Sequence, residues 1–458
     1  MRLNGSGATE AVRSIALAAL FGLVLEVAYG LLIPEVYETF GSGFREMTAA
    51  DRALNWVCAL LPAAWLPARH ERPSTVLGLA QYYFIHVPAC LLLAPVSRPV
   101  LAWSDVRALQ AAMVVGMLIL LAGQRLPRLA IRRPRLGARL YGTAFRGFGI
   151  AMAAYLVLVL GRNFRLTNLE EIYDVRAAAV EVSASAPGVL YVLGWFASVV
   201  LPIAFAAMAV RRRWFAASLA LAGYVFQLGI GGAKTSIRAI AVLPALSQLT
   251  RGPLERLPRA VPLGLAGLFA TALLLSVTGP PIVSVWFTAI TIERVFCVPT
   301  FLIAQYLDFF SNHDLTYFSH VTGINRLVEY PYLQDLPTTI GLYFYGVPIG
   351  SNAGMWAADG IAALGLVGIP FISAVAAGVF WAMDTLTVDL DITVTTTALG
   401  MIAMTFTNIS LATTLVSGGL FVLMGWAFVA PAKPAVEDAA RVDRTPAAPL
   451  PLPARGGR

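Results

Sequence analysis

Long apolar runs divide the chain and restrict its fold more than any other feature. A membrane-spanning helix needs about 20 mostly apolar residues, and twelve stretches are candidates. They cover roughly 14-33, 53-68, 76-95, 108-123, 140-160, 188-210, 214-230, 236-249, 260-278, 357-383, 392-408 and 411-430. The sequence therefore predicts an all-α, polytopic integral membrane protein of about 12 transmembrane helices.

Composition excludes the main alternatives to a membrane protein. Hydrophobic residues make up 58% of the chain and charged residues only 13%, whereas soluble domains carry about 25% charged residues. The three cysteines, Cys58, Cys90 and Cys297, lie in apolar stretches without a Cys/His cluster. Neither a zinc site nor a redox motif is predicted, and we expect no cofactor.

The distribution of basic residues predicts the orientation. With the N-terminus inside, the inner segments carry 21 Lys and Arg residues against 11 in the outer segments. Because cytoplasmic loops collect basic residues, both termini are expected to be cytoplasmic. Nucleic acid is not an expected partner, since the arginines are scattered between apolar spans rather than gathered on one soluble face.

The predicted organisation is a single membrane domain, 1-430, followed by a disordered cytoplasmic tail, 431-458, which contains six prolines. Two outer loops are long, at about 161-187 and 279-356. The second contains an apolar stretch, 285-310, that is long enough to span. Spanning would place the basic tail outside, so we expect this helix to lie in or dip into the outer leaflet.

A polar stripe is predicted along that helix. At about 100° per residue, Arg294, Gln305, Asp308 and Asn312 fall on one face of an otherwise apolar helix, with Glu293 beside them. Charges at membrane depth usually face a cavity or a partner. The alternative is that Arg294 pairs with Asp308 or Glu293 and only holds the helix in place.

Basic residues elsewhere are candidates for binding an anion. Lys234 and Arg238 follow a glycine-rich turn at an i, i+4 spacing, which suits a phosphate cradle at a helix N-terminus. The alternative is a turn whose basic side chains reach lipid headgroups. Arg176 lies in an outer loop that mixes arginines, carboxylates and aromatics, which suits phosphate binding or an amphipathic helix on the membrane.

Outer-loop polar residues are candidates for contacting a hydroxylated substrate. His313 could deprotonate a hydroxyl, although a lone loop histidine is often only solvated. Asn352 and Asp359 lie in an aromatic and glycine-rich segment that suits sugar binding or an interfacial aromatic belt. Glu35 and Glu38 lie in a segment with the composition of an ordinary acidic loop, and no metal site is predicted.

In their order along the chain, several segments resemble the integral-membrane O-antigen polymerase family, also called oligosaccharide repeat-unit polymerases. The resemblance covers roughly 225-425 and is weaker in the first half, where it rests on hydropathy and on 173-176. The matching segments are Glu293-Arg-Val-Phe, Ala304-Gln-Tyr-Leu-Asp-Phe-Phe-Ser-Asn, Ser351-Asn-Ala-Gly, Ala358-Asp-Gly-Ile-Ala-Ala-Leu-Gly-Leu-Val-Gly and Thr407-Asn-Ile-Ser-Leu.

The resemblance implies a glycosyltransferase at the outer face of the bacterial inner membrane. Such an enzyme moves a growing glycan from undecaprenyl pyrophosphate to a new lipid-linked repeat unit, and a chain-length regulator is a further implied partner. The implied roles are neutralisation of the pyrophosphate by Lys234, Arg238, Arg294 and Arg176, activation of the acceptor by His313, Asp308 or Glu293, and substrate contacts by Gln305, Asn312, Asn352 and Asp359. The open alternatives are an O-antigen ligase, which shares the donor, and a transporter or flippase.

Overall fold

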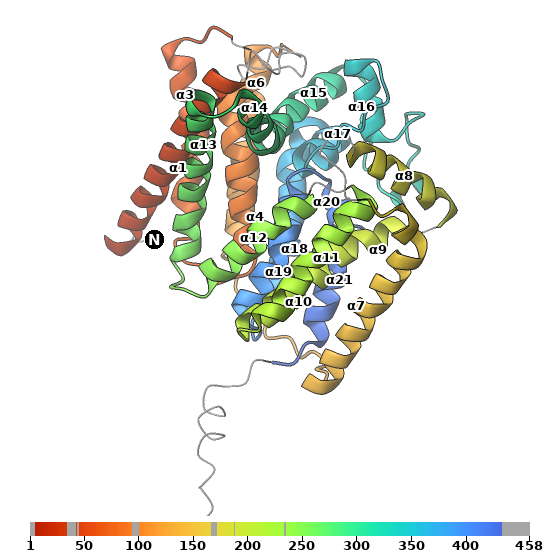
Figure 1. Ribbon diagram of the computed structural model, residues 1–458. Coiled ribbons are helices and arrows are strands. Elements are labelled where there is room, and N and C mark those ends of the chain that lie inside the picture. The colour runs from red at the N-terminus through yellow and green to blue at the C-terminus, as the bar shows by residue number, and fades with distance from the viewer. Residues whose placement is uncertain are drawn as a thin grey trace, which may run out of the picture.

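The computed structural model describes residues 5–33, 43, 45–93, 100–165, 172–186, 188–232 and 235–432. Within these ranges the regular elements are all helices, which confirms the predicted all-α fold (Figure 1). The predicted tail from residue 433 onward lies outside the described residues, as do Glu35, Glu38 and Lys234.

The helices of the first half lie in two groups, from α1 to α6 and from α7 to α11, and helices of the second half pack between them (Figure 1). Their bounds are α1 (Gly5–Leu32), α3 (Ala49–Leu60), η2 (Leu61–Trp65), α4 (Thr75–Ala80), η3 (Gln81–His86), α5 (Val87–Leu92), α6 (Trp103–Gly123), α7 (Ala138–Leu160), η4 (Gly161–Asn163), α8 (Ile172–Ser185), α9 (Val189–Trp195), η5 (Phe196–Val200), α10 (Leu201–Val210) and α11 (Trp214–Gly231).

The second half completes the bundle and adds a group of helices at one end of it. Its elements are α12 (Thr235–Thr250), α13 (Arg256–Thr278), α14 (Pro281–Thr288), η6 (Ala289–Cys297), α15 (Val298–Asn312), η7 (Ile324–Arg326), α16 (Leu336–Tyr345), η8 (Trp356–Ile361), α17 (Ala362–Leu364), η9 (Gly365–Val367), α18 (Gly368–Leu386), α19 (Ile392–Phe406), α20 (Leu411–Leu415) and α21 (Leu420–Val429).

Nine helical segments of the described residues are long and apolar enough to cross a membrane. Eight of them coincide with predicted spans, and the ninth is 281–312, which contains the segment expected to lie in the outer leaflet. The other four predicted spans form shorter helices: α3 with η2, α12, α19, and the broken pair α20 and α21. The chain is thus a polytopic membrane protein, as predicted.

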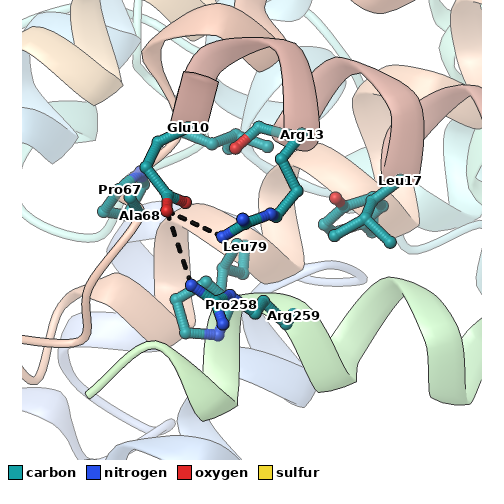
Figure 2. Close-up of a pocket in the computed structure, with 11 residues that line it drawn as sticks. Glu10, Arg13, Leu17, Pro67, Ala68, Leu79, Pro258 and Arg259 are labelled. Carbon is teal, nitrogen blue, oxygen red and sulfur yellow. Dashed lines mark hydrogen bonds and ion pairs between the residues drawn. The ribbon is translucent and has the colours of Figure 1, made fainter. Parts of the chain in front are cut away.

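The two ends of the bundle can be told apart by α1. We call the end at which α1 begins the proximal end and the end at which it finishes the distal end. Glu10 near the start of α1 accepts hydrogen bonds from Arg13, at 2.7 Å, and from Arg259 near the start of α13, at 3.5 Å (Figure 2). Both helices therefore begin at the proximal end. The cavity beside this cluster, about 10 Å³, holds no more than a water molecule.

Polar contacts join the proximal turns to one another. Arg69 forms an ion pair with Glu255, which precedes α13, at 3.0 Å, and Arg72 donates to the carbonyl of Leu126 after α6. Farther along that turn, a backbone hydrogen bond joins residue 136 to residue 429 at the end of α21. The first and last described residues therefore lie at the same end of the bundle (Figure 1).

The segment α14–η6–α15 remains at the distal end. It begins where α13 finishes, and its later parts pack against α5, which ends at the distal side, and against η8. Figure 1 places α14 and α15 together at that end of the bundle. Although the segment is long enough to span, it does not run from one end of the bundle to the other. This agrees with the prediction that it lies in or dips into one leaflet.

Candidate functional site

Three π-helical segments meet inside the bundle, where Phe296 also packs against the middle of α1 and α13. Phe84 of η3 stacks on Phe296 of η6 at 5.0 Å, and His86 of η3 contacts Trp356 of η8 edge-on at 6.1 Å. A π-helix is rare and weakens the regular hydrogen-bond ladder, and it occurs frequently at functional sites. This part of the fold is therefore a candidate for a functional site.

Two arginines of different elements lie within electrostatic range of each other. They are Arg238 in the first turns of α12 and Arg294 in η6. The Nε atom of Arg238 is buried without a hydrogen-bond partner, whereas the side chain of Arg294 is exposed. Among the described residues, no ion pair joins either arginine to a carboxylate.

This pair is suited to binding an anion. Two like charges held together cost free energy, which an anionic ligand between them would offset. Guanidinium groups match the oxygens of a phosphate in pairs, and their donors point outward in a fixed plane. The pair therefore has the chemistry of a phosphate or diphosphate site.

The two other predicted basic residues are not part of the observed pair. Lys234 lies outside the described residues, so its position relative to Arg238 stays a prediction. Arg176 is exposed on α8, which packs against α7 and α11.

The predicted polar stripe is broken. Residues 289–297 form a π-helix, so the spacing of 100° per residue does not continue from Arg294 into α15. Arg294 is exposed, whereas Gln305 is only 2% exposed, so the two side chains do not share one face. Glu293 is also buried, at 7%. No ion pair joins Arg294 to Asp308 or to Glu293, so the alternative in which such a pair only holds the helix in place is not observed.

The residues predicted to be catalytic lie at the two ends of α15. Glu293 and Arg294 precede its first residue, whereas His313 follows its last residue and Asp308 lies in its final turns. Fifteen helical residues span roughly 22 Å. The structure therefore places these four residues in two groups rather than in one centre.

His313 has a defined tautomer. Its Nδ1 lies 2.9 Å from the carbonyl oxygen of Phe309, which can only accept, so Nδ1 carries the proton of the neutral ring. The ring stacks on that of Phe309 at 4.1 Å and contacts Tyr343 edge-on at 5.2 Å. Nε2 of the exposed side chain is then an acceptor that could receive a hydroxyl proton. Asp308 interacts electrostatically with His313.

The predicted substrate-binding residues differ in their access. Asn312 and Asn352 are exposed and could contact a ligand. Gln305 is buried and donates to the hydroxyl of Tyr345 at 2.8 Å. Asp359 is 2% exposed and accepts from the backbone N–H of Leu411 at 2.5 Å. Its observed contacts hold the start of α20 in place.

Asp359 also lies near His320, a contact that the sequence did not predict. Its Oδ1 lies 3.8 Å from Nε2 of His320, and the other ring nitrogen of His320 lies 2.8 Å from the hydroxyl of Thr316. The backbone has positive φ angles at Tyr317 and Phe318, just before His320. Such strain is characteristic of functional sites. No local sequence signal pairs residues 320 and 359.

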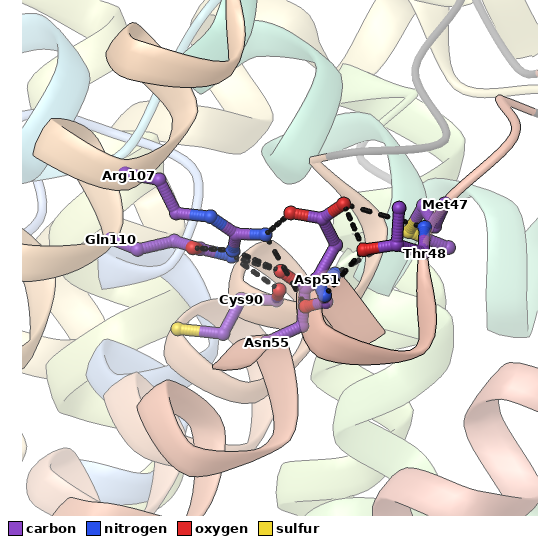
Figure 3. Close-up of polar contacts among 7 residues, drawn as sticks. All are labelled: Met47, Thr48, Asp51, Asn55, Cys90, Arg107 and Gln110. Carbon is purple, nitrogen blue, oxygen red and sulfur yellow. Dashed lines mark hydrogen bonds and ion pairs between the residues drawn. The ribbon is translucent and has the colours of Figure 1, made fainter. Parts of the chain in front are cut away.

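A second distal network was not predicted (Figure 3). Arg107 donates to Asp51 at 2.8 Å, to Asn55 at 2.6 Å and to Gln110 at 2.7 Å, and Gln110 donates to Asn55 and to the carbonyl of Cys90. These bonds tie α3, α5 and α6 together. A charged residue near the start of a span requires a partner, but the sequence did not show that Asn55 and Gln110 supply it.

Within the part of the chain that the structure describes, no three His, Cys, Asp or Glu side chains form a group that could hold a metal ion. Glu35 and Glu38 lie outside that part of the chain.

No family model matches the chain, and neither a curated protein nor a solved structure matches it. The functional interpretation therefore depends on the geometry of these residues and on the resemblance seen in the sequence.

Proposed function

We propose that the protein is a membrane glycosyltransferase that polymerises lipid-linked oligosaccharide repeat units. It transfers a growing glycan from undecaprenyl pyrophosphate to a new repeat unit at the outer face of the bacterial inner membrane, with the distal end outward. The observation that carries the proposal is the pair Arg238 and Arg294, which have no carboxylate partner among the described residues.

The chemistry of such a transfer requires a cationic site. The acceptor hydroxyl oxygen forms a bond to the anomeric carbon of the donor glycan, and the bond from that carbon to the diphosphate oxygen breaks. The diphosphate leaves with the electron pair, and a base takes the hydroxyl proton. Guanidinium groups placed at the departing oxygens stabilise the charge that develops there. Arg238 and Arg294 supply two such groups.

The length of α15 restricts the choice of base. The base must lie within hydrogen-bond reach of a hydroxyl that attacks the carbon next to the diphosphate. His313 lies beyond the far end of a helix roughly 22 Å long, whereas Glu293 is adjacent to Arg294. We therefore assign proton transfer to Glu293. Asp308, Asn312 and His313 then bind sugars farther along a lipid-linked glycan.

A deletion strain tests the proposed reaction and separates its rivals. Loss of a polymerase leaves lipid core capped with one repeat unit, loss of a ligase leaves uncapped core with lipid-linked polymer, and loss of a flippase traps single units on the inner face. We expect the first pattern. Arg294→Ala should reproduce it while the protein still inserts, and Arg326→Gln, another exposed distal arginine, should complement fully. Full-length ladders with Arg294→Ala would contradict the assigned role.

A transporter or flippase is the second candidate, because buried polar groups occur toward both ends of α6. Gln110 in its distal half is 0% exposed, and Gln124 at its proximal end is 7% exposed. Such groups could line a path through the membrane. Single units accumulating on the inner face of the deletion strain would favour this candidate.

A further inference from the structure

A second cavity lies at the proximal end, opposite the arginine pair. Its volume is about 400 Å³, and its walls come from η2, the turn at 66–74, the start of α4 and the end of α6. The lining includes Trp65, Arg69, Arg72, Gln124 and Arg125. This volume lies within the usual range of small-ligand sites.

The lining of this cavity carries three arginines and one carboxylate, Glu71. Arg69 is paired with Glu71 at 3.3 Å and with Glu255 at 3.0 Å. Arg72 lies 3.9 Å from the buried carboxylate of Asp384.

Arg125 differs from these two arginines. Its guanidinium donates to the backbone carbonyl of Trp65 at 3.1 Å. It has no ion pair among the described residues. Arg125 is therefore the cation of the lining that has no carboxylate partner among the described residues, and an anion could bind there.

Gln124 fixes one wall of the cavity. It donates through Nε2 to the carbonyl of Ser74 at 2.7 Å, which ties the end of α6 to the start of α4. Its Oε1 is buried and closed off from the cavity, so it is not available to a ligand there.

The position of the cavity favours a lipid over a soluble anion. It lies where the candidate spans 75–92 and 103–123 meet the proximal surface. Trp65 on its wall is 40% exposed, and tryptophan is typical of the membrane interface. Basic pockets between transmembrane helices bind the headgroups of anionic lipids.

We propose that this cavity binds the phosphoglycerol headgroup of an anionic phospholipid such as phosphatidylglycerol. The phosphate contacts Arg125 and the exposed edge of Arg72. The proposal is independent of the reaction at the distal end.

Lipid retention by the full chain tests the site. The purified protein is placed in nanodiscs that contain both phosphatidylglycerol and phosphatidylcholine, and the lipid that stays bound is measured by native mass spectrometry. We expect preferential retention of phosphatidylglycerol and a loss of roughly tenfold or more in affinity with Arg125→Gln. Arg125→Lys should restore part of the binding. Arg132→Gln, an exposed arginine of the same turn that does not line the cavity, should change nothing.

Two results would overturn the proposal. One is retention of phosphatidylglycerol by Arg125→Gln as strong as that of the unchanged protein, or no preference over phosphatidylcholine in the unchanged protein. The other is displacement of the bound lipid by inorganic phosphate or glycerol phosphate at equal affinity, which would assign the cavity to a soluble phosphate. Arg125 is exposed and bonded to a backbone carbonyl, so its variants are expected to fold.

Discussion

The contact between Gly360 and Gly368 offers a sharp test of how the distal helices are held. Gly360 belongs to η8, next to Asp359, and Gly368 begins α18. A Cβ atom added to Gly368 would lie 2.5 Å from the carbonyl carbon of Gly360 and closer still to its oxygen. Ordinary contact is 3.4–4 Å. Because the clash is with backbone, no side-chain rotation relieves it.

Gly368→Ala should therefore destabilise the protein through sterics alone. Gly368 has φ −61° and ψ −28°, which alanine adopts without strain. To restore ordinary contact with that oxygen, η8 and α18 must separate by roughly 1.5 Å, and overpacking of this kind costs about 1–3 kcal/mol. The shift would also strain the hydrogen bond from Leu411 to Asp359, so we expect polymer formation to fall as well.

Gly378→Ala in the same helix is the matched control. Nothing lies within 4 Å of a Cβ added at this exposed position, and alanine favours a helix interior by about 1 kcal/mol relative to glycine. Thermal unfolding in detergent, followed by size-exclusion chromatography, should show a lower unfolding temperature for Gly368→Ala and an equal or higher one for Gly378→Ala. Equal stability of the two variants would refute the proposed backbone contact.

Two further predictions concern buried groups at the proximal end. Ser74→Ala removes a 2.7 Å hydrogen bond to the fully buried carboxylate of Asp384, and should lower the free energy of unfolding by about 1.5–3 kcal/mol, whereas exposed Ser218→Ala should leave the unfolding temperature unchanged. Burial lowers the pKa of His70 to about 4 in the folded protein. As the pH falls from about 6.5 to 4, His70 is therefore protonated in the unfolded chain but still neutral in the folded one. Up to about 3 kcal/mol of stability should be lost across that window, and His70→Asn should flatten the pH dependence of the unfolding temperature.

Features that depend on local sequence were predictable. The spans follow from runs of apolar residues, which must be helical in a bilayer whatever their neighbours are. That the helix at 285-310 stays at one end followed from charge distribution, because crossing would have moved the basic tail to the outer side. The sequence predicted that Arg238 and Arg294 belong to one group of basic residues. It did not predict that these two lie within electrostatic range of each other.

Features that depend on tertiary contacts were not predictable. A π-helix at 289–297 arises where packing opens the backbone, and it changed the faces on which Arg294 and Gln305 lie. Asp359 accepts a hydrogen bond from the backbone of Leu411, a partner 52 residues away, and its contact with a substrate stays a prediction. Ser74 and Asp384 are separated by 310 residues. A single sequence does not show which distant residue a buried Asp or Ser side chain contacts.

The affinity of the purified protein for a polyprenyl diphosphate tests the arginine pair most directly. Each charge-assisted hydrogen bond contributes about 1.5–3 kcal/mol, so Arg238→Gln and Arg294→Gln should each weaken binding roughly 10- to 100-fold, whereas Arg326→Gln should not. Unchanged affinity in both variants, with the protein correctly folded, would show that the pair does not hold the diphosphate.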